Sequence, residues 1–386
     1  MDLEQALIQK LEGIKQKNLY RQLRTLSEAQ EKNTVIDGKE VLLFSSNNYL
    51  GLSNQTPIKE AAIAAITKYG IGSGGSRLTT GNLDLHMKLE STIAEFKKRD
   101  AAVLFNCGYM ANVGTLSALC SEEDMVIFSD ALNHASIIDG CRLSKAKTVI
   151  YAHNDINDLK AKIESVRPKK GLIVTDSVFS MDGDIANLPD IVQLARDSRL
   201  AVMTDDAHAL GVIGKTGRGI AEHFGMPAGD IDVMMGTLSK AVSSEGGFVC
   251  GSKNLCDYLK NTARSFIFST SLSPASIASS TSALEYIDAH PERVKQLQDN
   301  IAYLNHSFSR IGIESKSETA IIPVIIGSEE KGLHMFQRLF EMGIFVPCIR
   351  YPTVKKGEAR LRITLMATHT HSDIDYLVEC MKKIVN

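Results

Sequence analysis

The stretch "DIDVMMGTLSKAVSSEGGFVCG", residues 230–251, holds a single lysine, Lys240, between two short apolar runs. The residues around this lysine are mostly glycine, serine, threonine and alanine. Such small residues leave room for a bulky group to lie against the backbone. A solvated lysine in a strand-to-helix loop is the plainer interpretation. The alternative is an amine used for covalent chemistry, and the rest of the sequence has to decide between the two.

The two apolar runs that flank Lys240 are the last members of a series. Between about residues 100 and 251 the series reads "AAVLFN", "MVIFSD", "TVIYA", "GLIVTD", "LAVMTDD", "VMMGT" and "GGFVCG". Most of these runs are separated by segments with helical spacing, a pattern typical of βαβ units. The runs are apolar on both faces, as strands covered by helices on both sides require. The sequence therefore predicts an α/β fold with a mostly parallel central sheet.

Several of the predicted strands end in a polar or charged residue. These are Asn106, Asp130, Asp176, Asp205 and Thr237. In open α/β sheets, ligands bind beyond the carboxyl ends of the strands. We therefore expect these side chains to lie along one cleft.

After about residue 285 the pattern of apolar runs and helical segments changes. A long helical stretch leads into "IIPVIIG", the helical "GLHMFQRLFEMG", "IFVPCI" and "ARLRITLM". The last helix is expected to begin near "SDIDYLVECMKKIV", with Ser372 as its N-cap and Asp375 three residues on. This arrangement predicts a smaller α+β domain at the C-terminus.

The composition excludes several classes of protein. The net charge of −2 comes from 43 basic and 45 acidic residues, so there is no basic surplus for binding nucleic acid. Seven cysteines without a CxxC pair favour reduced thiols in the cytoplasm. The first 18 residues indicate an amphipathic helix with no signal-peptide core, and no apolar run is long enough to span a bilayer.

Three weaker motifs are set aside. "GIGSGG", residues 70–75, matches a dinucleotide-binding pattern, but it follows a helical segment where that motif follows a strand. Cys107 and His134 have no spacing that indicates a thiol and its base. "HTH", residues 369–371, is expected in a surface turn, and we predict no metal site.

The segment "VMTDDAHALG", residues 202–211, carries Asp205, Asp206 and His208. Paired acids at a strand end often cap a helix or bind a metal. Together with Lys240 they suggest a different use. An aldehyde cofactor needs a lysine for its Schiff base, a pyridine electron sink needs a carboxylate at its nitrogen, and a histidine can bond the ring oxygen.

The phosphate of such a cofactor needs hydrogen-bond donors. "NCGYMAN", residues 106–112, is expected to begin a helix after a strand, so its first amides would point at an anion. The candidate donors are Gly108, Tyr109, Thr237 and the hydroxyls of "FSTS" at 268–271. Each of these residues alone is more easily explained by a structural role. Their joint presence favours the binding of one aldehyde cofactor with a pyridine ring and a phosphate.

These motifs resemble the α-oxoamine synthase family, pyridoxal-phosphate enzymes of fold type I. The resemblance covers nearly the full chain and rests on "FSSNNYLGL", "GSGGSRLTTGN", "LNHASIIDG", "VTDSVFSMDGD", "DDAH", "GTLSKA", "FIFSTS" and "ARLRIT". It implies a large cofactor-binding domain at residues 46–285 and a small C-terminal domain at 286–386. Residues 1–45 would form an N-terminal arm that packs with the small domain.

The resemblance also implies roles for individual residues around pyridoxal phosphate. Lys240 would hold the cofactor, and Asp205 would pair with the pyridinium nitrogen. His134 would stack on the ring, while His208 and Ser180 would contact the ring-hydroxyl region. Lys240, Asp205, His134 and His208 form the expected catalytic set.

Further roles concern the phosphate and the second subunit. Gly108, Tyr109 and Thr237 would help to bind the cofactor. Thr270 would reach the phosphate in the neighbouring subunit, because members of the family are homodimers with interfacial active sites.

For the substrates, the resemblance implies that Arg362 binds the amino-acid carboxylate as a bidentate fork. Arg21, Asn47 and Thr353 would line the acyl-donor end. The expected reaction is decarboxylative condensation of L-alanine with a pimeloyl thioester, whose distal carboxylate calls for a cation such as Arg21 or Arg24. Glycine with acetyl-CoA is the alternative substrate pair, an aminotransferase is the alternative activity, and the thioester carrier, CoA or acyl carrier protein, stays open.

Two positions depart from the family pattern. Leu210 stands where threonine or serine is common, and Ser243 stands where glycine is common. Both are expected near the cofactor, so they bear on the fine geometry of the site.

Overall fold

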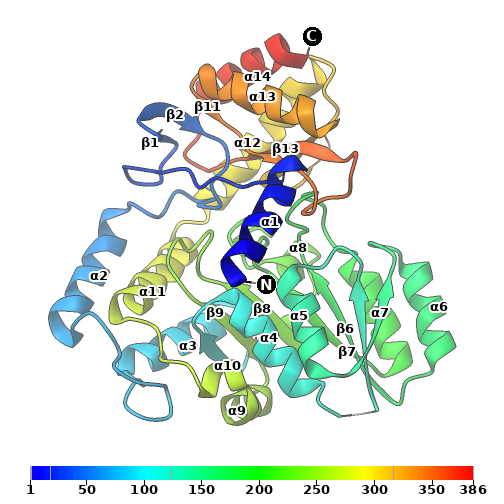
Figure 1. The fold of residues 1–386 in the computed structure, drawn as a ribbon. Helices are drawn as coiled ribbons and strands as arrows, with labels where there is room; N and C mark the ends of the chain where they lie inside the picture. The colour runs from blue at the N-terminus through cyan, green and yellow to red at the C-terminus, as the bar shows by residue number, and fades with distance from the viewer. Residues whose placement is uncertain (1, 18, 123, 316, 386) are drawn as a thin grey trace.

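A seven-stranded sheet forms the centre of the lower half of the molecule as drawn in Figure 1. The computed structural model describes residues 2–17, 19–122, 124–315 and 317–385. Along the sheet the strands follow the order β3-β9-β8-β7-β6-β4-β5. Their bounds are β3 Ala101–Phe105, β4 Met125–Asp130, β5 Lys147–Tyr151, β6 Lys170–Asp176, β7 Ala201–Asp205, β8 Val233–Thr237 and β9 Gly247–Gly251. Each strand coincides with one of the seven predicted apolar runs.

The sheet is mostly parallel, as the sequence predicts. Strands β8, β7, β6, β4 and β5 run parallel to one another, whereas β9 is antiparallel to both of its neighbours, β3 and β8. Consecutive residues of a strand point to opposite faces, and both faces are buried. In β6, for example, Leu172 and Val174 enter one apolar cluster and Ile173 enters the other.

Helices cover both faces of this sheet. The face that carries Leu172 packs against α4 (Gly108–Leu119), α5 (Ala135–Ser144), α9 (Lys253–Thr262) and α10 (Arg264–Ile267). The opposite face packs against α3 (Asp84–Phe96), α6 (Ile156–Val166), α7 (Leu188–Ser198) and α11 (Pro274–Ala289). Three shorter or outlying segments complete this part, namely α2 (Thr56–Tyr69), α8 (Ile220–His223) and a 3₁₀ turn at Ala228–Asp230.

Two small sheets bring the N-terminal strands next to the C-terminal part of the chain. One has the order β1-β2-β11 and the other β10-β13-β12. Their strands are β1 Asn33–Ile36, β2 Lys39–Leu43, β10 Ile321–Gly327, β11 Ile344–Phe345, β12 Cys348–Ile349 and β13 Ala359–Thr364. In Figure 1 the blue strands β1 and β2 lie beside the orange and red C-terminal elements. The domain boundaries at 45/46 and 285/286 stay a prediction.

Three helices complete the C-terminal part, namely α12 (Glu292–Ser309), α13 (Glu329–Glu341) and α14 (His371–Val385). At the other end of the chain, α1 (Leu3–Gln16) has no buried residue among those described. Within the described residues, we find no helix whose length and apolar character would let it cross a membrane.

The run "IFVPCI" divides into β11 and β12, which pair in different sheets. Two local expectations for the C-terminal part are wrong. The N-terminal cap of α14 is Thr370 rather than Ser372: the Thr370 hydroxyl accepts from the Asp373 amide at 3.2 Å, and the Asp373 carboxylate accepts from the Thr370 amide at 2.8 Å. His369 is buried rather than in a surface turn. Its ring stacks on Phe44 with centroids 4.3 Å apart, and burial lowers its pKa to about 4.

Candidate active site

Lys240 lies just beyond the carboxyl end of β8, in the loop that leads to β9. Its side chain is half-buried. Burial is the main reason that its pKa falls from 10.5 to about 8, and the charge of Arg362 acts in the same direction. The carboxylates of Asp205 and Asp176 act in the opposite direction. An appreciable fraction of this amine is therefore neutral, and nucleophilic, near neutral pH.

Asp205 is the last residue of β7, and its charge raises the pKa of Lys240. One carboxylate oxygen accepts a hydrogen bond from Asn112 Nδ2 at 2.7 Å, and the other accepts from the Ala207 amide at 2.9 Å. These two donors fix the carboxylate in a buried position. Asp176 lies in register with Asp205 on the next strand, and burial together with the Asp205 charge raises the pKa of Asp176 well above its usual value.

His134 precedes α5 and is joined to both acids. Its backbone amide donates to Asp176 Oδ2 at 2.7 Å, and its ring Nδ1 lies 2.7 Å from Ser136 Oγ. Ser136 Oγ in turn accepts from Asn112 Nδ2 at 2.8 Å. The side chain of His134 is otherwise exposed, which leaves its ring accessible to a planar partner.

His208 follows Asp205 by three residues and is buried. Its Nδ1 lies 2.6 Å from the hydroxyl of Tyr49, a residue that is completely buried. Burial, together with the positive charges of Lys240 and Arg362, lowers the pKa of His208 well below its usual value. The ring is therefore neutral across the physiological range.

Arg362 lies on β13 and brings the small C-terminal sheet to this region. Its Nε donates to the Ser180 carbonyl at 2.6 Å, and its Nη1 donates to Thr364 Oγ1 at 2.9 Å. Both terminal nitrogens lie 3.5 Å from Asn47 Oδ1. The guanidinium is thus held by neutral acceptors, and its charge remains uncompensated by these partners.

The expected phosphate donors surround the first turn of α4, which begins at Gly108. A Cβ at Gly108 would lie 3.0 Å from Met235 Cε and 3.3 Å from Thr237 Cβ, so the helix start and the end of β8 approach closely. Thr237 Oγ1 donates to the Gly246 carbonyl at 2.9 Å. The Tyr109 hydroxyl donates to Asp139 on α5.

Thr270 is exposed, and its contacts described here do not involve Lys240. It forms a β-bridge with Ser76, and its carbonyl accepts from Asn106 Nδ2 at 2.6 Å. Exposed apolar side chains flank it in the chain and across the bridge, with exposed fractions of 72% at Phe268 and 59% at Leu78.

Arg21 and Thr353 meet at an open groove of about 480 Å³. Arg21 Nη2 donates to Thr353 Oγ1 at 3.3 Å. Arg24 also lines the groove, but its guanidinium is paired with Asp37 at 2.7 Å. Of these two arginines, Arg21 is the one without a carboxylate partner among the described residues.

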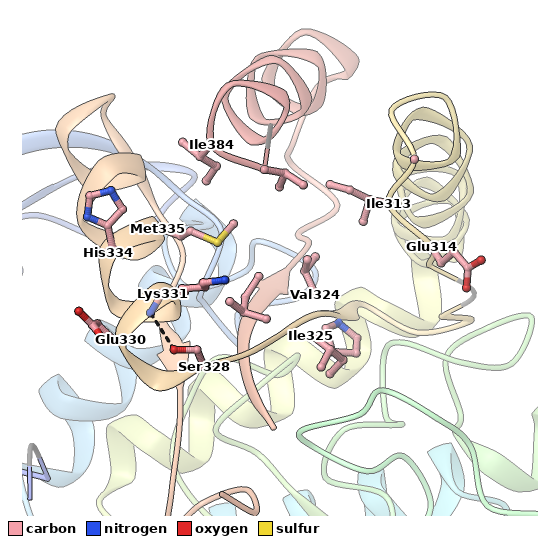
Figure 2. Close-up of a pocket in the computed structure, with 14 residues that line it drawn as sticks. Ile313, Glu314, Val324, Ile325, Ser328, Glu330, Lys331, His334, Met335 and Ile384 are labelled. Atoms are coloured by element: carbon pink, nitrogen blue, oxygen red, sulfur yellow. Dashed lines mark hydrogen bonds between the residues drawn. The ribbon is translucent and has the colours of Figure 1, made fainter. Parts of the chain in front are cut away.

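A larger groove, of about 1090 Å³, lies elsewhere, among β10, α13 and the end of α14 (Figure 2). Figure 2 shows apolar side chains such as Val324, Met335 and Ile384 around it, with Glu330 and Lys331 on the adjacent helix. None of the described residues that line it belongs to the predicted site. Cavity size therefore does not locate the chemistry in this protein.

The two departures from the family pattern have clear surroundings. Ser243 has a positive φ of 59°, a conformation that glycine adopts more easily. Its hydroxyl donates to Asn48 Oδ1 at 2.5 Å, which holds the loop in that conformation. Leu210 is buried in the main apolar core.

The sequence did not indicate three contacts that complete the site. Asn112 lies in "NCGYMAN" and Tyr49 lies in "FSSNNYLGL", two motifs that the sequence analysis uses. Their hydrogen bonds to Asp205 and His208 are not visible in those motifs. Asp206, the second acid of the pair, forms a buried ion pair with Lys97 at 2.6 Å, which fixes the residue that follows β7. A lysine distant in sequence gives no signal for such a pair.

The chain matches the family described as "Aminotransferase class I and II" over residues 39–381. This protein belongs to the class I and II aminotransferase family. Among family relatives, the 8-amino-7-oxononanoate synthase of Lysinibacillus sphaericus is 51% identical over 97% of this chain and 96% of its own. The 8-amino-7-oxononanoate synthase 2 of Bacillus subtilis is 47% identical over 100% of this chain and 98% of its own.

Solved structures agree with this family membership. A serine palmitoyltransferase variant from S. paucimobilis, solved with a bound PLP-myriocin aldimine, has a TM-score of 0.93 and 30% sequence identity, and the match covers 100% of this chain and 98% of that one. The fold type I architecture and the α-oxoamine synthase resemblance expected from the sequence are confirmed.

Proposed function

We propose that this protein is a pyridoxal-phosphate-dependent acyltransferase that condenses L-alanine with a pimeloyl thioester. The products would be 8-amino-7-oxononanoate, carbon dioxide and the carrier thiol, in a step of biotin biosynthesis. Full-length relatives with this activity in their names support the assignment. The structural observation that carries it is the position of Lys240 just beyond the end of β8, with Asp205 and Asp176 in register at the ends of the neighbouring strands β7 and β6.

The residues present fit pyridoxal phosphate by their chemistry. The cofactor requires an amine, a carboxylate and an anion-binding helix start, and Lys240, Asp205 and the first turn of α4 supply them at one edge of the sheet. The missing side chain of Gly108 lets that helix start lie close against Met235 and Thr237 at the end of β8. His134 offers an exposed ring for stacking.

Pyridoxal phosphate, when bound, supplies an aldehyde and an electron-accepting pyridine ring. Lys240 would hold the aldehyde, and its amine would be placed to take the proton from the substrate Cα and to return it. Asp205 would keep a proton on the ring nitrogen, because Asn112 and the Ala207 amide orient its carboxylate. His208 and Ser180 would contact the ring-hydroxyl region.

The substrates would bind on the side of the small sheets. Arg362 would bind the amino-acid carboxylate, since its present partners are neutral oxygens that a carboxylate can displace. Asn47, Arg21 and Thr353 would line the path of the acyl donor. The Arg21 guanidinium would face the distal carboxylate of the pimeloyl chain.

The active unit would be a homodimer. Gly108, Tyr109 and Thr237 would bind the phosphate from within one subunit, and Thr270 would reach the phosphate bound by the other. Phe268 and Leu78 are exposed apolar side chains on the two segments that the Ser76–Thr270 bridge joins, and exposed apolar groups there support an interface at this position.

Thiol release by the purified protein with pyridoxal phosphate tests the proposal. L-Alanine with pimeloyl-CoA is compared with glycine and acetyl-CoA, and with each amino acid alone. The proposal expects faster release with the first pair. Faster release with the second pair would move the protein to the 2-amino-3-ketobutyrate CoA ligase branch, and accumulation of the pyridoxamine form without thiol release would indicate an aminotransferase.

A further inference from the structure

The buried tyrosine beside His208 has no role in the proposed chemistry. Tyr49 is completely buried, and its hydroxyl lies 2.6 Å from His208 Nδ1. The same hydroxyl lies 3.2 Å from Asn47 Oδ1, which in turn lies 3.5 Å from both terminal nitrogens of Arg362. A continuous line of polar contacts therefore joins the carboxylate-binding arginine to the histidine.

Counting protons along this line fixes the state of the histidine. The Tyr49 hydroxyl carries one proton, and the amide oxygen of Asn47 can only accept. If the hydroxyl donates to Asn47, the contact of 2.6 Å must be a hydrogen bond donated by His208 Nδ1–H. The opposite arrangement would leave two acceptor oxygens facing each other without a proton. The Tyr49–Asn47 and Tyr49–His208 contacts can both be hydrogen bonds only when neutral His208 carries its proton on Nδ1. Its Nε2 is then a free acceptor.

We propose that Tyr49 is a positioning residue that sets the tautomer of His208 and couples it, through Asn47, to the occupant of Arg362. A substrate carboxylate on Arg362 competes for the guanidinium protons that now face Asn47. Asn47 Oδ1 then accepts more strongly from Tyr49, and Tyr49 from His208. The tautomer claim stands on the contacts alone, whereas the coupling to substrate rests on the proposed function.

The test uses ¹⁵N NMR of the histidine side chains in the full-length protein, with and without added pyridoxal phosphate. The His208 signals are assigned by their loss in His208→Asn. In the unmodified protein we expect the Nδ1–H tautomer. In Tyr49→Phe the acceptor for Nδ1–H is gone, so we expect a shift towards Nε2–H. The dissociation constant for L-alanine, followed through the cofactor absorbance, should rise about 2- to 10-fold, the effect of one lost neutral hydrogen bond.

Two further variants sharpen the test. Tyr151 is also buried but does not belong to this line of contacts, so Tyr151→Phe makes the same chemical change elsewhere and should leave the tautomer and the alanine affinity unchanged. Asn47→Ala removes the competing acceptor, so the Tyr49 hydroxyl should turn and donate to His208 Nδ1, which also shifts the proton to Nε2.

An Nε2–H tautomer in the unmodified protein, or an unchanged tautomer in Tyr49→Phe and Asn47→Ala, would overturn the inference. These outcomes are independent of the reaction. A tautomer shift in a protein that releases no thiol would uphold the role of Tyr49 while the proposed function fails. Thiol release with an unchanged tautomer would do the reverse.

Discussion

The lowered pKa of Lys240 makes a quantitative prediction about the loading of the cofactor. Only the neutral amine attacks an aldehyde. With a pKa of about 8, about one tenth of Lys240 is neutral at pH 7. An ordinary lysine with a pKa of 10.5 would have only about 0.03% of its amine neutral at that pH, roughly 300-fold less. The pH dependence of loading should therefore level off well below the range of a surface lysine.

The assay is the rate of absorbance change when cofactor-free protein is mixed with pyridoxal phosphate between pH 6 and 10. A simple amine measured in parallel corrects for titration of the cofactor itself, and Lys240→Ala gives the background. We expect the corrected rate to rise tenfold per pH unit below pH 7, to be half-maximal near pH 8 and to reach a plateau above about pH 9. Asp205→Asn should move the midpoint to lower pH, because the Asp205 charge raises the pKa of Lys240. A rate that keeps rising tenfold per unit up to pH 10 would refute the argument.

The remaining predictions concern four separate features of the chain. Asp205→Ala should lower the rate of thiol release by at least about 100-fold at unchanged thermal stability, because a fixed charge at the reacting centre is lost, and near-normal turnover would contradict its role. Arg21→Ala should raise the KM for pimeloyl-CoA about tenfold and leave the KM for L-alanine unchanged, and equal effects on both would exclude a role at the acyl end. Lys97→Met should destabilise the protein by about 3–5 kcal/mol in urea unfolding, because it leaves a buried carboxylate unpaired, and a loss below 1 kcal/mol would be inconsistent with that burial. Thr370→Ala should cost about 1 kcal/mol through loss of the α14 cap, whereas the exposed Ser372→Ala should cost almost nothing, and the reverse order would reject the assigned cap.

The central sheet could be predicted because its strands leave a strong local signal. A strand buried on both faces must be apolar throughout, and all seven runs from "AAVLFN" to "GGFVCG" became strands. The C-terminal part was harder because its elements are short and one-sided. Nothing within "IFVPCI" indicates that its halves pair in different sheets, since pairing is decided by distant strands. The N-terminal cap of α14 was predicted two residues too late, because Thr370 and Ser372 have equivalent capping chemistry.

The candidate site was predictable to the extent that its residues lie at strand ends. Asp176 and Asp205 are in register on neighbouring strands, so the topology alone brings them together. The contacts between motifs were not accessible in the same way. The hydrogen bonds from Asn112 to Asp205 and between Tyr49 and His208 span 93 and 159 residues, and they depend on the packing of helices and loops that a single sequence does not specify.

The identity of the cofactor-bearing lysine tests the account most directly. The protein is incubated with pyridoxal phosphate, reduced with borohydride, digested and mapped by mass spectrometry. We expect one modified residue, Lys240, and no cofactor absorbance in Lys240→Ala. Stable modification at another lysine, or a Lys240→Ala variant that binds the cofactor and turns over normally, would contradict it.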